Sequence, residues 1–483
     1  MAHVTGTASD VHDALEKLRT ELKTNATLAA LTPAQTWAEL MYVQNNIETS
    51  STNATLGTTK HLLNLCRYDP RFVPSVSITT EATDTTVSSL VMGTSFLRFK
   101  FLTARAVTSI LYKASRLTNQ TSSIQSFRLQ YSDDDSTWTT AATITNQTGW
   151  SQLEERTFSG WAATGSHLYW RILIDALGSG TTLNARSLLM FDGDEIVNSS
   201  EGLTVLKGPG LSGTNEIFIG LISRFNPLTS EAILMVFGFT GFLPAVRSLF
   251  MQPGVNQYSI PMLALRTSPM PYWFTMSGRR AIFVYKVGTI YSAGYAGFFL
   301  PYASEGQYPY PMAIGGSITT TNYTNGSLLP SKIDASHSVF CMPGSQTPAT
   351  STGILNAPST LAVMQPTAVW ESYANRGSTT SEGVNLNPYR GVFPQWAWGG
   401  VASSSADKPL YENVGGGYTL WSHVLTNPLP LPRVNLGELD GTKQISGHLN
   451  ASENTGTFDG KPYVIFQNTY RSSITEFWAL LAE

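Results

Sequence analysis

The sequence has few charged residues. Aspartate, glutamate, lysine and arginine together make up 13% of the 483 residues, and the formal net charge is −3. This charged share is about half of what soluble domains usually carry. Because the sequence has no excess of lysine and arginine that could bind a phosphate backbone, we expect no nucleic-acid partner. Hydroxyl and amide side chains fill the polar positions instead, which is typical of a stiff β-rich protein that packs among neighbours or faces the outside.

Cysteine is almost absent as well. Cys66 and Cys341 are far apart, which excludes a disulfide framework and a paired-cysteine metal site. Residues 1–7 have neither the basic segment nor the apolar segment of a signal peptide. The most apolar run, residues 232–246, is too short to span a bilayer and contains glycine and proline. We expect a buried strand followed by a turn there, and no membrane insertion.

Short catalytic motifs are missing. The 7 histidines are scattered, and neither the zinc-protease motif nor the hydrolase nucleophile motif occurs. Glu154 and Glu155 are adjacent, so on a strand they point to opposite faces and cannot act as a pair. Two distant carboxylates that meet in a glycosidase cleft leave no short motif, so an undetected hydrolase is a rival hypothesis. We expect no enzymatic activity and no cofactor.

Three local patterns imitate ligand sites. Residues 208–213 match the dinucleotide fingerprint, but a strand-like segment follows where that site needs a helix, so we expect a strand–loop–strand turn. Asp133 to Asp135 lack the glycine and the distal glutamate of a calcium loop, which favours a hairpin turn. Asp192, Asp194 and Glu195 form either a weak cation site or a solvated domain boundary, and we favour the boundary. We therefore expect no metal.

The most informative segment that is present predicts a β-hairpin. Apolar residues alternate at Phe127, Leu129 and Tyr131. Three aspartates then make a polar turn, and a second alternating run starts at Trp138. This pattern with a period of two residues indicates a sheet with one buried face. Similar strand patterns flank it throughout residues 76–197, which predicts a jelly-roll β-sandwich over that range.

The N-terminal region, residues 1–50, is predicted to be a helical segment that packs with the C-terminal unit. Ser9 or Asp10 can cap a helix whose apolar residues recur at helical spacing from Val11 to Leu22. Acidic residues lead this helix and basic residues trail it, which suits the helix dipole.

A second helix start is predicted at Thr32. Proline follows at the first helical position, and Gln35 is placed as the capping-box partner. The segment after it, residues 37–43, fits a short helix or a strand, and the pattern leaves both open. Residues 51–75 are interpreted as a linker to the sandwich.

Residues 198–483 are predicted to form a second β-rich domain with long loops. Two hairpins are expected, one turning at residues 277–278 and one at residues 459–460, each followed by a third strand-like run. They represent either a diverged internal duplication or convergence on a common pattern. Residues 315–360 and 372–430 lack a periodic apolar pattern, which is typical of binding or assembly loops or of disorder.

Five aromatic residues of this domain are the candidate site residues. Their rings either stack on sugars or belong to the core or to an interface, and we favour the structural interpretation. The five are Trp396, Trp398, Trp421, Tyr308 and Tyr310.

Residues 80–195 resemble a discoidin domain, also called the coagulation factor 5/8 C-terminal type. The resemblance lies in residues 96–101, 127–138, 150 and 167–172. It implies an eight-stranded jelly roll, a fold that often binds glycans or other surface ligands through loops at one end. The two cysteines that commonly clasp extracellular members are absent here.

The rest of the chain resembles a structural protein encoded among the tail genes of tailed bacteriophages. The resemblance lies in residues 13–19, 207–218, 270–280, 300–311, 436–441 and 477–480. It implies that the discoidin-like module is an insertion and that residues 1–50 and 200–483 form one structural unit. It carries no activity and no ligand residues.

These observations predict a non-enzymatic structural component of a tailed phage virion, in the tail, baseplate or collar. We expect a homo-oligomer, assembled in the host cytoplasm, whose partners are other virion proteins and copies of itself. The jelly roll would project for attachment to host-surface glycan or for contacts between subunits. The rival hypothesis is a carbohydrate-binding adhesin or a polysaccharide depolymerase, indicated by the aromatic clusters and the discoidin resemblance.

Overall fold

The protein is mainly β, as predicted, with helices near its N-terminal end. The computed structural model describes residues 1–43, 85–87, 90–115, 122–152, 154–193, 195–199, 201–212, 215–225, 231–244, 249–256, 260–319, 340, 361–372, 389–390, 421–426, 435–445, 450–467 and 477–483. Helices α1 (Val11–Thr24) and α2 (Ala26–Ala29) and the short 3-10 helix η2 (Leu249–Met251) accompany five sheets.

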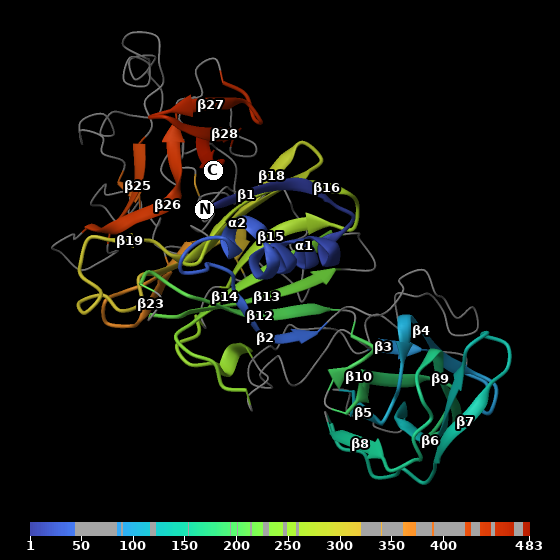
Figure 1. Ribbon diagram of the computed structural model, residues 1–483. Helices are drawn as coiled ribbons and strands as arrows, with labels where there is room; N and C mark the ends of the chain where they lie inside the picture. Colours follow the sequence, from blue (N-terminus) through green and yellow to red (C-terminus); the bar gives the residue numbers. More distant parts are fainter. Residues whose placement is uncertain are drawn as a thin grey trace, which may run out of the picture.

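Two antiparallel sheets form a sandwich that stands apart from the other three sheets (Figure 1). The five-stranded sheet has the order β11 (Glu195–Ile196), β10 (Leu183–Asp192), β5 (Ser109–Ala114) and β8 (Glu155–Ser159), with β3 (Thr85–Val87) paired to β10. The four-stranded sheet has the order β4 (Phe96–Arg105), β9 (His167–Leu177), β6 (Ile124–Ser132) and β7 (Thr139–Ile144). The predicted hairpin is therefore present as β6 and β7.

The alternating residues of the hairpin fill the space between these two sheets. Phe127 and Leu129 of β6 are buried, as is Trp170 of the neighbouring strand β9. The ring of Phe127 meets Phe158 of the opposite sheet edge-on, with ring centroids 5.3 Å apart. Aromatic pairs of this kind contribute about 0.5–1.5 kcal/mol beyond the area that they bury.

Three further sheets carry the rest of the described chain. The first large sheet runs β1 (Ala2–Ala8), β16 (Met270–Ser277), β17 (Arg280–Val287), β18 (Ile290–Phe298), β20 (Met312–Gly315), β22 (Leu361–Met364), β23 (Trp370–Ser372). The second large sheet runs β2 (Ala38–Val43), β12 (Gly202–Gly208), β13 (Ile217–Phe225), β14 (Glu231–Phe239), β15 (Pro261–Arg266), β21 (Ile318–Thr319). The C-terminal sheet runs β24 (Tyr389–Arg390), β25 (Trp421–Thr426), β26 (Asn435–Ile445), β29 (Phe477–Leu481), β28 (Lys461–Gln467), β27 (Thr455–Phe458), with β19 (Leu300–Pro301) paired to β26.

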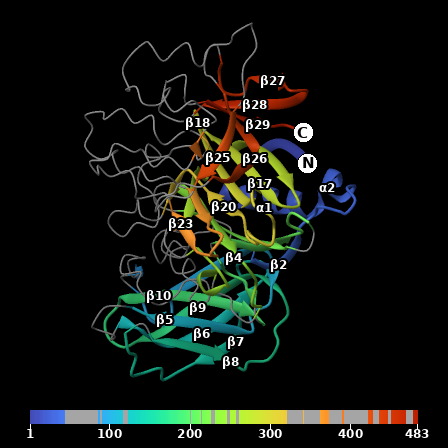
Figure 2. The same ribbon diagram turned by 90° about the vertical axis from the view of Figure 1, so that its left-hand side faces the viewer.

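Strand β17, in the middle of the first large sheet, contains a continuous apolar stretch because both of its faces are buried. One of its faces contributes Phe283 to the core shared with the second large sheet. Its other face contributes Ile282 and Val284 to a cluster that also contains Phe466 and Trp478 of the C-terminal sheet. A strand covered on both faces has no polar side, so alternation disappears. The three sheets therefore form stacked layers around β17 (Figure 2).

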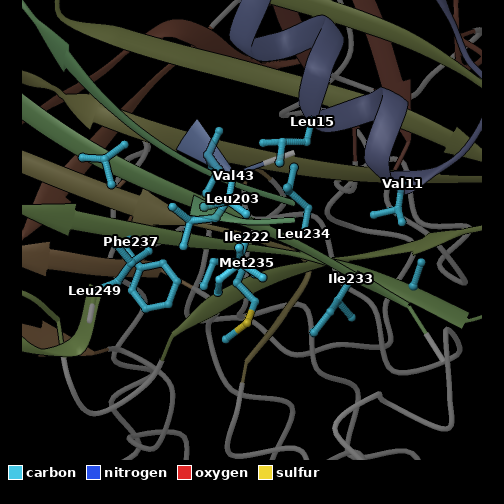
Figure 3. Packing of buried hydrophobic residues seen from close by; sticks show 14 of the residues in the cluster. Val11, Leu15, Val43, Leu203, Ile222, Ile233, Leu234, Met235, Phe237 and Leu249 are labelled. Atoms are coloured by element: carbon cyan, nitrogen blue, oxygen red, sulfur yellow. The ribbon is translucent and has the colours of Figure 1, made fainter. Parts of the chain in front are cut away.

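Helix α1 begins as its sequence predicts. The Asp10 carboxylate accepts hydrogen bonds from the backbone N–H groups of His12 and Asp13, which selects Asp10 over Ser9 as the cap. The predicted apolar stripe is buried, and Figure 3 shows Val11 and Leu15 on the side of the helix that faces the second large sheet. Each fully buried leucine or valine contributes about 1.5–3 kcal/mol relative to an exposed one. The helix thus fixes residues 1–43 to strands that lie more than a hundred residues away.

The second predicted helix start, at Thr32, is wrong. A short helix, α2, ends before it, and the chain then turns into strand β2, which resolves the open choice for residues 37–43 in favour of a strand. The Gln35 side-chain oxygen accepts from the Gly278 N–H at 3.1 Å instead of capping a helix. The Trp37 indole donates to the Ser277 carbonyl at 2.9 Å. These contacts with the β16–β17 turn outweigh a local capping signal worth about 1 kcal/mol.

The N-terminal region contributes two strands, of which β1 was not predicted and β2 was one of the two alternatives for residues 37–43. Strand β1 pairs with β16 over seven residues, from Ala2 opposite Met276 to Ala8 opposite Met270. Strand β2 pairs with β12. Residues 1–43 therefore enter both large sheets, each at an edge.

The other strand predictions for the C-terminal domain agree with the structure. The first predicted hairpin is β16–β17, and the second is β27–β28, whose turn residues Asp459 and Gly460 have positive φ values of 51° and 74°. Each hairpin is extended by a third antiparallel strand, β18 and β29 respectively. The apolar run at residues 232–246 contains the buried strand β14. No helix in the described part of the chain is long and apolar enough to cross a membrane.

Candidate binding face of the sandwich

The outer face of the four-stranded sheet carries a transverse row of polar residues, one from each strand. Arg98 of β4 lies opposite Arg171 of β9, which lies opposite Gln130 of β6. Gln130 in turn lies opposite Thr140 of β7. Because side chains alternate along a strand, the buried neighbours on either side of Arg98 fix the arginine on the outer face. We call these four residues the arginine row.

Arg171 is the centre of the row and is held by two aromatic rings. The carbon of its guanidinium lies 4.1 Å from the centroid of Trp138 and 4.8 Å from that of Phe96. Its Nε donates to the Gln130 side-chain oxygen at 2.7 Å, and the Gln130 amide donates to the Thr140 hydroxyl at 2.9 Å. Each cation–π contact contributes about 0.5–2 kcal/mol, depending on how dry it is.

Charges of both signs surround Arg171. Burial lowers the pKa of Arg171, the charges of Arg128 and Arg98 lower it further, and Asp135 opposes them. A guanidinium stays protonated despite such a shift, because its ordinary pKa lies far above neutral pH. In the ranges that the structure describes, Arg171 has no carboxylate at ion-pair distance. Arg171 differs in this respect from Arg98 and Arg128, each of which forms an ion pair with an aspartate.

Its two arginine neighbours are paired. Arg98 forms a 2.5 Å ion pair with Asp135, and Arg128 forms a 2.8 Å ion pair with Asp175. The hydrogen bonds to Asp175 raise the pKa of Arg128. Two like charges directly opposite on a sheet destabilise it unless an anion lies nearby, and Asp135 supplies that anion for Arg98.

The three consecutive aspartates of the β6–β7 turn have three different partners. Asp133 contacts the His167 ring nitrogen Nδ1 at 3.0 Å, and Asp135 pairs with Arg98. Asp134 accepts from the backbone N–H groups of Ser136 and Thr137, which hold the pKa of Asp134 well below its ordinary value. The turn is thus the predicted hairpin turn, stabilised from within by Asp134. No group of three or more potential metal ligands occurs in the part of the chain that the structure describes.

The glycine-rich segment at residues 208–213 joins two strands, as expected. Strand β12 ends at Gly208 and β13 begins at Ile217. Gly210 has a positive φ of 77°, and its N–H donates to the Gly278 carbonyl at 3.0 Å. No helix follows the segment in the described residues; the Leu211 and Ser212 N–H groups donate to the Asn215 side-chain oxygen within the loop, and Gly210 binds the β16–β17 turn.

The second acidic cluster lies at the junction of β10 and β11. Asp192 is paired with Glu195 in the register of these strands, and Glu195 contacts Arg105 at 3.4 Å. Asp194 lies outside the described residues.

The five aromatic candidates are not brought together within the described residues. Tyr308 is buried, with its hydroxyl donating to the Met364 carbonyl and its ring edge-on to Phe299. Tyr310 packs half-buried against the main core. Trp421 belongs to strand β25, without a described side chain, and Trp396 and Trp398 lie outside the described residues. A glycan or interface role for this group stays a prediction.

The residues of the arginine row were missed as a site, although their strands were predicted. The alternation around residues 96–101 already indicates that Arg98 lies on a solvent-facing side. The contact of Trp138 with Arg171 could not be predicted from the sequence pattern, because it depends on how the β6–β7 turn folds over the sheet.

No family model and no curated protein matches the chain. Among solved structures, a carbohydrate-binding module from a family 31 glycoside hydrolase of Clostridium perfringens is similar at 9% identity, covering 30% of this chain and 97% of its own, with a TM-score of 0.23. The family 32 carbohydrate-binding module of Streptococcus pneumoniae EndoD is similar at 11% identity, covering 32% and 99%, with a TM-score of 0.20. A factor 5/8 type C domain from Bacteroides fragilis is similar at 9% identity, covering 32% and 96%, with a TM-score of 0.20. The two-sheet sandwich itself rests on the strand pairing described above.

Proposed function

We propose that this protein is a non-enzymatic attachment protein whose sandwich binds acidic carbohydrate through the arginine row. Arg171 carries the proposal, because it combines a fixed guanidinium with a positive charge that no carboxylate of the described chain pairs. A guanidinium matches the two oxygens of a sugar carboxylate in geometry and charge. The adjacent Trp138 ring offers an apolar surface of the kind that packs on sugars.

We further propose that the protein is a structural component of a tailed phage virion. It would assemble in the host cytoplasm with copies of itself and with other virion proteins, while the sandwich projects toward the host surface. The resemblance of the chain outside the sandwich to phage tail-gene products supports this location. The stacked layers also provide a stiff base, from which the sandwich stands apart (Figures 1 and 2).

The location and the binding are tested separately. Mass spectrometry of purified phage particles should detect peptides from both ends of the chain at a fixed ratio to the other tail proteins. Absence of these peptides would contradict the virion proposal and would leave carbohydrate binding as the property of a free adhesin.

Binding is tested with the full chain on arrayed polysaccharides, with and without uronic acids. We expect the acidic polymers to bind, and Arg171→Lys to weaken binding roughly ten- to a hundredfold, since a charge-assisted hydrogen bond contributes about 1.5–3 kcal/mol. Arg156→Lys is the matched control, because Arg156 also stacks on a tryptophan (Trp150, 3.9 Å) but is paired with Glu154. Equal losses in both variants, or equal binding of neutral polymers, would refute the site.

The same polysaccharides test the absence of enzymatic activity. A non-enzymatic protein leaves the length of the bound polymer unchanged over many hours. Release of new reducing ends, abolished by a single aspartate or glutamate substitution, would identify a depolymerase and overturn the proposal.

A further inference from the structure

Strand β1 leaves one long edge of the first large sheet open. Its seven residues pair with β16 without a register shift, so the strand is continuous. On the other side of β1, the described chain supplies no backbone hydrogen bond to residues 2–8. At the opposite end of this sheet the last strand, β23, has three residues. The β1 edge is therefore the longer of the two terminal edges.

The open edge is accessible. Thr5, Gly6 and Thr7 are all exposed. Gly6 has no side chain, so its exposure is that of the main chain. A Cβ atom at Gly6 would lie 2.5 Å from the Tyr272 hydroxyl, so the side-chain direction at this position points into the protein. The accessible surface at Gly6 is consequently the backbone edge.

Residues 2–8 themselves lack the features with which proteins commonly block an edge strand. Natural sheets protect their edges with lysine, proline, charged side chains or bulges. Residues 2–8 contain no charged side chain and no proline. The comparable edge of the second large sheet, β2, has a register irregularity, and its Glu39 binds Arg19 and Lys23. Residues 2–8 therefore carry fewer of these protective features than the β2 edge does.

We propose that the strand that pairs with this edge is β1 of a second copy of the chain, antiparallel about a two-fold axis at Thr5. In that register Ala2 lies opposite Ala8, His3 opposite Thr7, and Val4 opposite Gly6. The larger residues His3 and Val4 meet the smaller Thr7 and Gly6, the remaining pairs join small or medium residues, and no like charges face each other. The same surface serves both subunits, as a two-fold interface requires. The contact joins two seven-stranded sheets into one continuous sheet.

The contact between two isolated copies is weak. One strand pair of this length buries well below the ~1,200 Å² of a typical stable interface. We therefore expect a dimer that dissociates at roughly micromolar to hundred-micromolar concentrations, where the corresponding affinity is about 5–8 kcal/mol. In an assembled array the same pairing becomes effectively intramolecular and much stronger.

The register gives a sharp cross-linking test in the full-length chain. In a background with Cys66 and Cys341 replaced by serine, Thr5→Cys places two thiols on directly opposite residues, about 5 Å apart at Cβ. Thr7→Cys is the matched control, because its two copies are four residues apart along the strands, or about 13 Å. A thiol-specific linker with a reach of about 8 Å should yield covalent dimer at least tenfold faster for Thr5→Cys than for Thr7→Cys.

A second variant tests the edge itself. Thr5→Lys places like charges opposite each other across the two-fold axis and should shift sedimentation equilibrium to monomer, with unchanged circular dichroism and thermal midpoint. The proposal is overturned if the wild-type chain stays monomeric up to millimolar concentration without Thr5→Cys dimer. Equal cross-linking of the two cysteine variants overturns it as well, since random collision or another register would then explain the product.

Discussion

Replacing Asp440 with asparagine should destabilise the junction between the first large sheet and the C-terminal sheet. Arg280 of β17 is fully buried there, and its Nε lies 3.1 Å from an Asp440 oxygen on β26. Arg279 contacts the same oxygen at 2.7 Å, and Arg280 also donates to the Thr275 carbonyl. Asp440 is thus the counter-charge for two arginines.

The expected cost follows from the burial of Arg280. An asparagine at position 440 retains the shape but leaves a buried guanidinium without its anion, which costs about 3–5 kcal/mol of unfolding free energy. Burial opposes ionisation of Asp440, but the charges of Arg280 and Arg279 and their hydrogen bonds exceed it and lower its pKa. A depressed pKa means that this stability is complete above the unfolded pKa of about 3.9 and is lost as the pH falls through the folded pKa.

Urea unfolding, followed by circular dichroism and by hydrogen exchange of the β26 amides, measures this cost. The control is Glu483→Gln, which removes the exposed 3.9 Å pair with Lys461 and should change the free energy by less than about 1 kcal/mol. The double variant Arg280→Met, Asp440→Leu should recover much of the loss, because it removes both buried charges. A loss below 1 kcal/mol for Asp440→Asn, or equal losses for Asp440→Asn and the control, would refute the reasoning.

Three further outcomes are expected. Burial lowers the pKa of His12 from 6.5 to about 4, so the unfolded chain binds a proton before the folded chain does as the pH falls. The contribution to the free energy of unfolding is therefore complete above about pH 6.5 and falls by about 3 kcal/mol toward pH 4. In His12→Gln the free energy of unfolding should depend less on pH over this window. Chemical denaturation at several pH values checks this, and a slope unchanged in the variant would contradict it. Leu18→Ala on the buried face of α1 should cost about 2–5 kcal/mol by leaving a cavity, against less than about 0.5 kcal/mol for the exposed Lys17→Ala. Asp134→Ala should speed hydrogen exchange of the Ser136 and Thr137 amides, with protection in β17 unchanged; protection retained in the turn would show that Asp134 does not hold it.

The candidate site was only partly accessible to sequence reasoning. The outward position of Arg98 and the existence of the β6–β7 hairpin follow from alternation within a few residues. The contact of Arg171 with Trp138 does not, because it joins residues on different segments of the chain. The pairing of Arg98 with Asp135 likewise depends on the turn reaching back to a strand 37 positions earlier.

The N-terminal region also shows which features follow from local sequence and which depend on tertiary contacts. The cap and the apolar stripe of α1 were predicted because side chain-to-backbone bonds and helical periodicity act within one or two turns. Thr32 and Gln35 form a valid local helix signal, which failed because the β16–β17 turn offers Gln35 and Trp37 better partners. Tertiary contacts override a local preference of this size.

The sequence alone determined that this chain is β-rich, contains a hairpin-built sandwich, and has a capped amphipathic helix near residue 11. Each of these properties depends on side-chain periods and hydrogen bonds between near neighbours. The tertiary structure alone decided that β1 lies beside β16 and that three arginines share one sheet face. Strand partners are chosen by which faces can be buried together, and this choice joins residues that lie more than two hundred positions apart.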